Sequence, residues 1–501
     1  MKKNNIKLVL RVLSILVTAA LLTETAGSIR TAAQTTEEPF DSYNYDYWGY
    51  IHYTPSPYTT ERIITGETLT FNGENIGAFN GPKDFCKDDE GNLYIADTGN
   101  NRIVVMDPDV KYVINVITGY TVDGAEYTFK EPYGVCVSAK NQLYICDSGN
   151  KKIVVLDRDT LEYIKVIENP RSESLDDTFV FTPLKVVVDY ADRIYCIAKN
   201  QFQGIMVFEE DGSFATFFGT IEVKISAWEK FWKRIATKEE RSNQKLYIPT
   251  EFTGLDIDPD GFVYATNIDS DGVQGVRRLN PSGEDVIKKG ENSNVGGDLD
   301  TEGSTDYAGP SQFADVVYRD NGMYSCLDKK RGRIFTYDYE GNLLYIFGGL
   351  GYQEGTLQIP AAIEAIGDRI VVLDSQRNQI VIYSVTEYGD LINRAVALRY
   401  EGDETEAVAL WERVLELDED NELANTGIGK AYLSAGDYKL AMKYLKLGMN
   451  KSYYAIAYKR YRNAWLANYI GYFFTGAVVI IAGIIVLIRV RKRRKGAKSD
   501  E

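Results

Sequence analysis

The chain has 501 residues, which is too long for a single domain, and its 44% hydrophobic content is ample for globular cores. Its formal net charge is −16, and residues 34–488 carry −25, since the two ends hold twelve of the 56 basic residues and three of the 72 acidic ones. This charge argues against nucleic acid or anionic lipid as partners of the surface at large.

The N-terminus has the pattern of a secretory signal peptide over residues 1–33. Basic residues precede and enter the apolar run LVLRVLSILVTAALL (8–22), and small residues follow, with candidate cleavage after Ala26 or Ala33. An uncleaved anchor is the alternative, although the run is short and is interrupted by Arg11.

Residues 34–57 form a linker rich in Tyr and Trp. Two interpretations stand: the rings anchor a strand across the rim of the following domain, or exposed rings stack on sugars. The linker also holds His52, the single histidine of the chain. One histidine excludes multi-histidine metal clusters, and we find no Ser–His–Asp or Cys–His pairing around it.

Two stretches that follow are near copies of each other. They read LYIADTGNNRIVVMD (93–107) and LYICDSGNKKIVVLD (143–157), 50 residues apart. Self-similarity at such a period indicates a repeat architecture. Each copy is a β-rich run, a polar turn and a second β-branched run, which predicts strand, turn and strand.

Weaker copies continue down the chain at 194–208, 263–279, 323–338 and 370–384. Further strands are expected before and after most copies, which gives four strands per unit and six units. The fold class is therefore predicted as mainly β, a closed six-bladed β-propeller over 58–386. YTTERIITG (58–66) is the candidate for the missing outer strand of the last blade.

At the turns of these copies, the chain resembles the NHL-repeat family, whose blades carry Asp-x-x-Asn-x-Arg between two strands. The residues that carry the resemblance are Asp97, Asn100 and Arg102, then Asp147, Asn150 and Lys152, and more loosely Asp374, Asn378 and Gln379. Some propeller lyases and lactonases of similar shape use axial metals held by His or carboxylates. With one histidine, only a carboxylate version is open here.

The first residues of the six predicted inner strands should form a ring at one mouth of the propeller. Within that ring Asp84 and Asp315 are the only acids, and Lys185 joins them. Two acids and a lysine predict a mixed polar mouth rather than a metal cage, so no cofactor, metal or catalytic residue is expected. The candidate binding residues of the mouth are Lys83, Asp84, Tyr133, Lys185, Thr253 and Asp315.

Two acidic segments resemble parts of a calcium loop. DIDPDG (256–261) has the first half of such a loop, but position twelve is Asn267 and no helices flank it, so a hairpin turn is predicted. The segment from Asp298 to Gly303 is equally incomplete.

An insertion at 221–244 predicts a basic aromatic helix. Trp228, Phe231 and Trp232 fall on one helix face, with lysines and an arginine on others. This face either docks a partner or the outer bilayer surface, or it packs on the propeller flank or on the helical segment that follows the propeller. We include the three aromatic residues among the candidate binding residues.

After 388 the hydrophobic period becomes helical. Residues 399–421 and 432–452 align at an offset of 34, so the segment 388–469 resembles a pair of tetratricopeptide (TPR) repeats. Residues 453–469, rich in Tyr and basic residues, are expected to cap this short array.

The chain ends with a predicted transmembrane helix at 470–488 and a basic tail at 489–501. IGYFFTGAVVIIAGIIVLI carries no charge and is long enough to span the hydrocarbon core. The basic tail then predicts a cytoplasmic C-terminus and an ectodomain outside the cell, held at the cell membrane by this single span.

The odd number of cysteines, five, leaves at least one thiol free, and four of them sit at matching positions of the repeats, which indicates packing rather than disulfides.

The sequence favours a non-enzymatic, membrane-anchored binding or scaffold protein with protein partners, such as components of a membrane transport system like a sugar importer. A propeller-type hydrolase or lactonase acting through Asp84 and Asp315, and a surface glycan receptor acting through the aromatic linker, are the alternatives.

Overall fold

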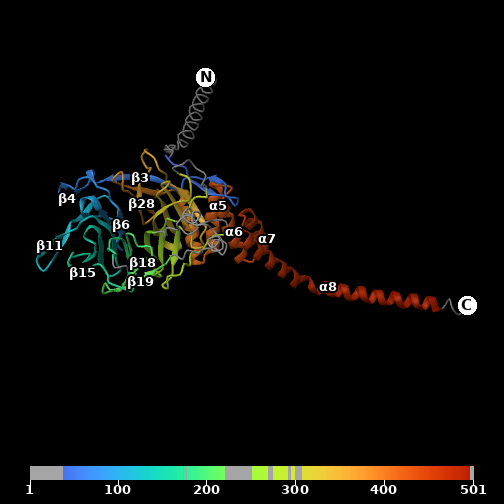
Figure 1. Cartoon of the computed structure of the whole chain (residues 1–501). Coiled ribbons are helices and arrows are strands. Elements are labelled where there is room, and N and C mark those ends of the chain that lie inside the picture. Colours follow the sequence, from blue (N-terminus) through green and yellow to red (C-terminus); the bar gives the residue numbers. More distant parts are fainter. Residues whose placement is uncertain are drawn as a thin grey trace, which may run out of the picture. The chain divides into compact units, whose positions relative to one another are not determined.

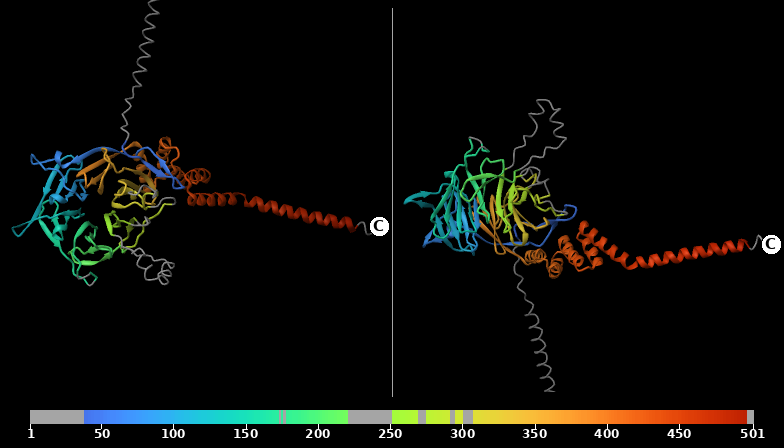
Figure 2. Two further views of the ribbon diagram at one scale, coloured as in Figure 1. Left: turned by 45° about the horizontal axis from the view of Figure 1, so that its top comes forward. Right: turned by 90° about the horizontal axis from the view of Figure 1, so that it is seen from below.

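The computed structural model describes residues 38–172, 174–175, 178–220, 251–268, 275–290, 295–299 and 307–496, with side chains up to 492. Six small sheets are arranged around a common axis in this part of the chain, and the left view of Figure 2 shows the ring. The predicted signal peptide and the insertion 221–244 lie outside the described residues.

Five of the six blades have at least four antiparallel strands, and blade 4 has three among the described residues. Blade 1 is β6 (Asp84–Lys87), β7 (Leu93–Asp97), β8 (Arg102–Met106) and β9 (Val113–Ile117). Blade 2 is β12 (Pro132–Val137), β13 (Gln142–Asp147), β14 (Lys152–Asp157) and β15 (Tyr163–Ile167). Blade 3 is β16 (Pro183–Val188), β17 (Ile194–Ala198), β18 (Ile205–Phe208) and β19 (Phe214–Phe218).

The second half of the ring follows the same plan. Blade 4 is β20 (Phe252–Ile257), β21 (Val263–Asn267) and β22 (Val276–Leu279). Blade 5 is β23 (Phe313–Tyr318), β24 (Tyr324–Asp328), β25 (Arg333–Tyr337) and β26 (Leu343–Phe347). Blade 6 is β27 (Pro360–Ile366), β28 (Arg369–Asp374) and β29 (Gln379–Val385) with β3 (Tyr58–Thr65). Two hairpins decorate the ring, β4 (Thr70–Phe71) with β5 (Glu74–Asn75) and β10 (Gly119–Val122) with β11 (Ala125–Thr128).

An N-terminal strand closes the ring, as the sequence predicts. β3 pairs antiparallel with β29, from Tyr58 opposite Val385 to Thr65 opposite Gln379. The first strand of the propeller thereby becomes the outer strand of its last blade, which closes the ring.

The aromatic linker adds strands to blade 5. β1 (Tyr43–Tyr45) and β2 (Ile51–Tyr53) form a hairpin, and Tyr43 pairs with Ile346 of β26. Tyr43 is buried, whereas Trp48 and Tyr50 are 70% and 72% exposed. The prediction that the linker anchors a strand on the propeller rim is confirmed for Tyr43, and sugar stacking by the exposed rings stays a prediction.

The recurring Asp of the repeat has a structural role. At the end of the second strand of a blade, its carboxylate accepts a backbone N–H from the segment that leads into the same blade. The pairs are Asp97 with Asn80 N (2.8 Å), Asp147 with Lys130 N (2.7 Å), Asp328 with Gln312 N (2.9 Å) and Asp374 with Gln358 N (2.7 Å). In blade 1, Asn100 and Arg102 bond the same carboxylate at 2.8 and 2.7 Å. The motif therefore fixes the blade entry.

The five cysteines are free thiols, as the repeat register predicts. Cys146, Cys196 and Cys326 are buried between strands, and Cys86 and Cys136 are half-buried on inner strands.

Four short helices follow the propeller: α4 (Glu387–Glu401), α5 (Glu404–Leu417), α6 (Glu422–Ser434) and α7 (Tyr438–Leu447). Consecutive helices pack on one another, and α5 and α7 begin 34 residues apart. Ala407 and Ala441, the small residues aligned by that offset, are both fully buried. The helical expectation is confirmed, and the tetratricopeptide assignment stays a prediction.

These helices are joined to the propeller through buried contacts. Glu340, in the turn after β25, pairs with Arg399 of α4 and at 2.7 Å with Lys430 of α6. His52 Nε2 of the linker hairpin lies 2.8 Å from Asp418 Oδ1 after α5. Apolar residues of α4, α5 and α6 share one core with residues of blades 5 and 6. Propeller, linker hairpin and helices thus pack together.

The last helix, α8 (Lys451–Gly496), is continuous from the helical segment to the C-terminal end of the described chain (Figure 1). Its stretch Lys451–Lys492 contains a window with a mean hydropathy of 2.6, none of which is buried. The helix is long and apolar enough to cross a membrane. It starts earlier than the predicted span because the preceding aromatic stretch joins it without a break.

Candidate functional site

A cavity of about 720 Å³ lies on the axis of the propeller. Five of the six inner strands contribute polar side chains to its wall: Lys87, Lys185, Asp256, Asp315 and Glu364. It opens toward the turns after the inner strands, where residues of α4 complete the wall, among them Asn393 and Arg394. Its volume lies in the range of small-molecule sites.

The inner end of the cavity is closed by three charged side chains. Lys185 Nζ lies 2.6 Å from Asp84 Oδ1 and 3.0 Å from Asp315 Oδ2. The lysine comes from blade 3, and the two acids come from blades 1 and 5. One cation thus bridges three alternate blades across the axis.

The intervening blades leave room for this bridge because their corresponding residues are small. They are Gly134, Gly254 and Ala362. A Cβ added to Gly254 would lie 2.5 Å from Asp315 Cα, so glycine is required there by close approach of neighbouring strands.

Both acids of the bridge also bind the next blade. Asp84 Oδ2 accepts the Val135 N–H at 3.1 Å, and Asp315 Oδ2 accepts the Ile363 N–H at 3.1 Å. The other oxygen of the second acid, Asp315 Oδ1, is buried and has no hydrogen-bond partner among the described residues. The two carboxylates therefore link neighbouring blades by hydrogen bonds, and Asp315 Oδ1 is left without a hydrogen-bond partner among the described residues.

Burial dominates the electrostatics of this bridge. Burial, opposed by Lys185 and reinforced by Asp84, raises the pKa of Asp315 to about 7. The pKa of Asp84 is also raised by burial, against Lys185. Burial opposes the charge of Lys185, but the two carboxylates outweigh it and raise its pKa above the ordinary value.

A second polar level lies two residues further along the inner strands. Lys87, three residues after Asp84, reaches this level with its side chain: Nζ is 3.1 Å from Glu364 Oε1 and also donates to the Ala365 carbonyl at 2.6 Å. Asp256 accepts the N–H groups of Ile257 and Tyr318 at 2.8 and 2.5 Å. Burial and the nearby Glu364 raise the pKa of Asp256 to about 7.

The thiols of Cys86 and Cys136 belong to the same level and line the cavity. Burial raises the pKa of both, to about 12 for Cys136. Neutral thiols are poor nucleophiles and poor metal ligands, so they act as wall residues.

Helix α4 is fixed over the cavity opening by a buried guanidinium. Arg319 donates to the hydroxyls of Tyr345 and Tyr58 at 2.8 and 2.7 Å, and Asn393 of α4 bonds both hydroxyls in turn, at 2.7 and 3.3 Å. The position of α4 is therefore set by a satisfied network.

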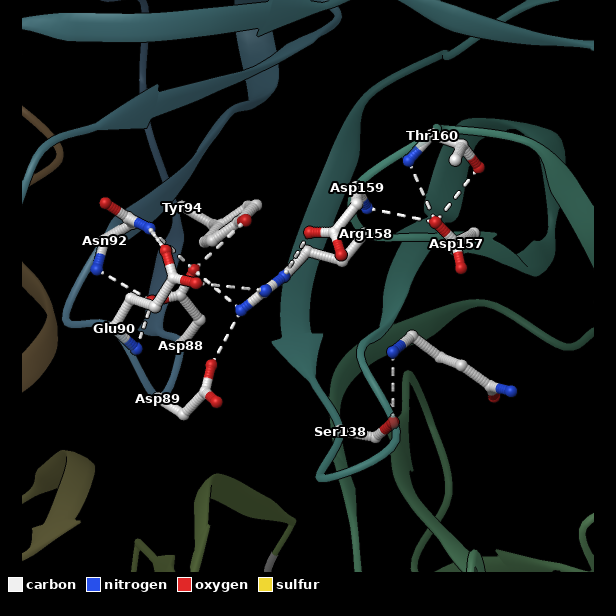
Figure 3. Close-up of polar contacts among 11 residues, drawn as sticks. Asp88, Asp89, Glu90, Asn92, Tyr94, Ser138, Asp157, Arg158, Asp159 and Thr160 are labelled. Atoms are coloured by element: carbon white, nitrogen blue, oxygen red, sulfur yellow. Dashed lines mark hydrogen bonds and ion pairs between the residues drawn. The ribbon is translucent and has the colours of Figure 1, made fainter.

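An acidic turn of blade 1 adjoins the opening. Asp88 Oδ1 accepts the N–H groups of Glu90 and Asn92, which shapes the turn (Figure 3). Arg158 of blade 2 lies among the carboxylates of this turn, 2.7 Å from Asp89 and 3.4 Å from Asp88 (Figure 3). The ion pairs tie blade 2 to blade 1.

The predicted mouth residues separate into two groups. Asp84, Lys185 and Asp315 come together as predicted. Lys83 instead donates to Ser375 Oγ at 3.0 Å, and Thr253 donates to the Phe313 carbonyl at 2.8 Å. Neither of these two is among the cavity-lining residues, and neither is Tyr133, whose pKa is raised by burial and by Asp84. The remaining candidates, Trp228, Phe231 and Trp232, lie outside the described residues.

Sequence reasoning missed Lys87, Asp256 and Glu364. The prediction placed the polar mouth at the first three residues of each inner strand, whereas the cavity lies beyond them. Counting two residues further along each predicted strand would have found Asp256 and Glu364 on the same face, because strand side chains alternate.

The acidic segment 256–261 is a hairpin turn, as predicted. Asp258 Oδ1 accepts the Phe262 N–H at 2.9 Å, and its other oxygen pairs with Arg278. The carboxylate of Asp298 is taken by Arg331 and Arg333. Among the described residues, no three His, Cys, Asp or Glu side chains are arranged to hold a metal ion. That no cofactor is needed stays a prediction.

Comparison with known families identifies two NHL repeats. Residues 79–106 and 129–156 match the NHL repeat model, which places the repeats in blades 1 and 2. The search of curated proteins returned no match.

Among solved structures, the chain is similar to virginiamycin B lyase from Staphylococcus aureus, at 12% identity and a TM-score of 0.40 over 65% of this chain and 99% of that one. It is similar to Kuenenia stuttgartiensis hydrazine synthase, at 11% identity and a TM-score of 0.36 over 62% and 98%. It is also similar to a protein of unknown function from Bacteroides thetaiotaomicron, at 14% identity and a TM-score of 0.41 over 68% and 80%. These values carry no conclusion about activity.

Proposed function

We propose that this protein is a membrane-anchored binding or scaffold protein whose propeller and helices bind partner proteins outside the cell. The main supporting observation is that the propeller and the helices pack together and are connected directly to the apolar helix. The propeller, the linker hairpin and α4–α7 share buried contacts, and the helices lead directly into the apolar helix α8. Such an arrangement holds a large repeat surface next to a membrane.

The proposed orientation rests on charge at the two ends of the chain. A basic cluster follows the apolar part of α8, beginning at Arg489, and an N-terminal segment with the pattern of a signal peptide precedes the propeller. Positive residues remain on the cytoplasmic side of a span. The propeller and helical segment would then lie outside.

Binding rather than catalysis is favoured by the state of the mouth residues. Asp84 and Asp315 share Lys185 and also accept backbone N–H groups of neighbouring blades. A catalytic acid or nucleophile needs access to substrate, and these carboxylates are 2% exposed. If the protein is a hydrolase or lactonase of this site, Asp84→Ala with Asp315→Ala must abolish turnover.

We propose components of a membrane transport system, such as a sugar importer, as the partners; this rests on the resemblance of the domain combination alone. The exposed rings of Trp48 and Tyr50 support carbohydrate as a second class of ligand. Deletion of 38–57 must abolish glycan-array binding if the linker is that site.

The test is co-purification of the full chain from membranes in mild detergent. The control is an unrelated ectodomain fused to residues 470–501, which carries the same span and tail. We expect membrane proteins that are recovered in near-stoichiometric amounts with the full chain and not with the control. Recovery of no membrane protein above the control level would refute the scaffold role.

Orientation is tested separately by protease treatment of intact cells. Digestion of the propeller without lysis is the expected result. A propeller that is protected in intact cells and cut only after lysis would contradict the proposed topology.

A further inference from the structure

A second cavity, of about 580 Å³, lies where the linker hairpin meets the helical segment. Its wall combines residues of β1 and of the turn that follows it with residues of α6 and of the turn between α7 and α8. We call it the hairpin groove. Its volume is in the range of small-molecule sites, and it shares no lining residue with the axial cavity.

We propose that the hairpin groove binds a sugar ring that carries no acidic group. Trp48 provides the stacking surface, and carboxylate and amide side chains pair with the hydroxyl groups of the sugar. This inference rests on the binding role proposed above and deepens it, because it assigns the carbohydrate to one groove and to one of the exposed rings.

Trp48 is an exposed ring that is held in position. It lines the groove, and 70% of it is exposed. Its ring stands edge to face against the ring of Tyr47, with centroids 5.0 Å apart and planes at 87°. Tyr47 is fixed in turn, because Lys451 Nζ lies 4.5 Å from its ring centroid. The face of an aromatic ring is negative and attracts the weakly positive C–H groups of a sugar, and a ring already in place loses little conformational freedom on binding.

Two carboxylates beside this ring keep an acceptor for hydroxyl groups. Asp46 Oδ1 accepts the N–H groups of Trp48 and Tyr50 at 2.9 and 2.8 Å, which shapes the hairpin turn. Glu422 Oε1 of α6 accepts the Tyr47 N–H at 3.2 Å, which ties the turn to the helix. Both acids line the groove, and the second oxygen of each has no hydrogen-bond partner among the described residues. A carboxylate oxygen accepts hydrogen bonds from hydroxyl groups.

Two buried amides leave one atom each unpaired in the groove. Asn425 Nδ2 donates to the Asn421 carbonyl at 3.1 Å, and Asn450 Oδ1 accepts the Tyr453 N–H at 3.0 Å. Asn425 Oδ1 and Asn450 Nδ2 have no partner in the described part of the chain. The two residues are only 7% and 9% exposed and both line the groove. Neither unpaired atom is fully enclosed, so a group bound in the groove can reach it.

An unpaired acceptor and an unpaired donor on adjoining elements suit hydroxyl groups. Thr426 Oγ1 donates to the Gly448 carbonyl at 3.1 Å, so the start of α6 lies against the turn that leads to Asn450. A hydroxyl group both donates and accepts, and one class of ligand therefore satisfies the amides and the carboxylates together. Pairing polar atoms that are otherwise unsatisfied favours binding.

The charge of the groove excludes anionic ligands. Its lining contains neither Lys nor Arg among the described residues, and its one histidine, His52, lies 2.8 Å from Asp418. Sugar phosphates, sulfated sugars and uronic acids would be repelled by the four acids of the lining. These acids are Asp46, Glu419, Asp420 and Glu422.

The experiment is a printed array of neutral and acidic oligosaccharides, probed with the full chain in a detergent that has no sugar head group. We expect binding to at least one neutral oligosaccharide, and at least tenfold weaker binding to its sialylated, sulfated or uronic-acid form. Binding to no neutral oligosaccharide, or equal binding to the acidic forms, would overturn the proposal.

Salt dependence separates a sugar from a cationic peptide, the other occupant that an acidic groove attracts. The neutral oligosaccharide that binds most strongly on the array is titrated by calorimetry at about 50 and about 500 mM sodium chloride. Its affinity should change less than twofold, because salt screens ion pairs and not stacking. A lysine-rich peptide that displaces this oligosaccharide at low salt and binds more tightly would refute the assignment to sugar.

Point variants locate the site. Trp48→Ala should weaken binding of that oligosaccharide at least tenfold, and Glu422→Gln, which keeps an acceptor for Tyr47, at least threefold. The matched controls are Tyr50→Ala in the same turn and Tyr352→Ala on the propeller, whose rings are 72% and 92% exposed and do not line the groove. Both controls should bind as wild type does.

Unchanged affinity in a Trp48→Ala protein with the native circular dichroism spectrum contradicts the inference. So does an equal loss in Trp48→Ala and Tyr50→Ala, which would assign the sugar to the exposed hairpin surface rather than to the groove. Co-purification of membrane proteins with wild type and Trp48→Ala is measured in parallel, because it tests the scaffold role independently of the sugar.

Discussion

Replacing Lys185 by methionine is the sharpest test of the axial bridge. The change keeps an unbranched side chain that is one atom shorter, and it removes the ammonium group that lies within 3.0 Å of both Asp84 and Asp315. Removing one partner of a buried ion pair costs about 3–5 kcal/mol, because the remaining charge is left uncompensated. Here two carboxylates would remain. The free energy of unfolding at pH 8 should therefore fall by at least that amount.

The pH dependence supplies a second check. The folded pKa of Asp315 is about 7 against 3.8 for an exposed aspartate, so between these pH values the folded state holds a proton that the unfolded state has lost. The contribution of Asp315 to wild-type stability consequently decreases as the pH rises from 4 to 7, by an amount on the order of 4 kcal/mol at ~1.4 kcal/mol per pKa unit. In Lys185→Met both acids can take up protons at pH 5, so the loss there should be smaller than at pH 8 by about 2 kcal/mol or more.

The assay is equilibrium urea unfolding followed by far-ultraviolet circular dichroism at pH 5 and pH 8. The triple variant Lys185→Met, Asp84→Asn, Asp315→Asn is the control, because it removes all three charges and should recover much of the stability. A loss below 1 kcal/mol at both pH values would refute the reasoning. So would a triple variant that is less stable than Lys185→Met alone.

Three further predictions follow from the same structure. Burial opposes the charge of Glu340, but Arg399 and Lys430 outweigh it and lower its pKa to about 2, so its contribution to stability is complete above pH 4.5 and is lost as the pH falls through 2. Glu340→Gln should therefore increase hydrogen exchange in α4 and α6 at pH 7, and by much less at pH 2. Gly254→Ala places a methyl group 2.5 Å from Asp315 Cα and should cost about 1–3 kcal/mol in urea unfolding, from steric overlap. Gly124→Ala is the comparison without overlap: nothing lies within 4 Å, and its cost reports only the backbone strain of a position with φ of +81°. Deletion of 470–501 should move the protein from the floating membrane fraction to the soluble bottom fraction of a flotation gradient run without detergent. A truncated chain that still floats with the membranes contradicts anchoring by α8.

Much of the fold could be predicted because each repeat has a short sequence pattern that specifies its strands and turn locally. The two near-identical copies at 93–107 and 143–157 give strand, turn and strand from alternation and turn residues, and their acids bond within their own blade. The count of six blades and the closing strand at 58–66 followed from the same period. The free state of the cysteines was predictable too, because their positions recur in register with the strands.

The candidate site was predictable only in part. Asp84, Lys185 and Asp315 could be placed on one ring because they hold equivalent positions in three predicted strands. Asp256 and Glu364 were missed because sequence shows only that a residue lies on an inner strand, and not how far along the axis the ring is open. That depth depends on the glycines and on the lysine that closes the inner end.

The sequence by itself determined the architecture: strand periodicity, turn chemistry and an uncharged apolar run are local properties that each segment carries alone. Only the tertiary structure decided what the polar residues of the inner strands do. Lys185 and its two acids are separated by 101 and 130 residues, and the cavity they border is completed by α4 from beyond the propeller. Such contacts, and the pKa values that follow from burial, arise from how distant segments pack, which no local pattern records.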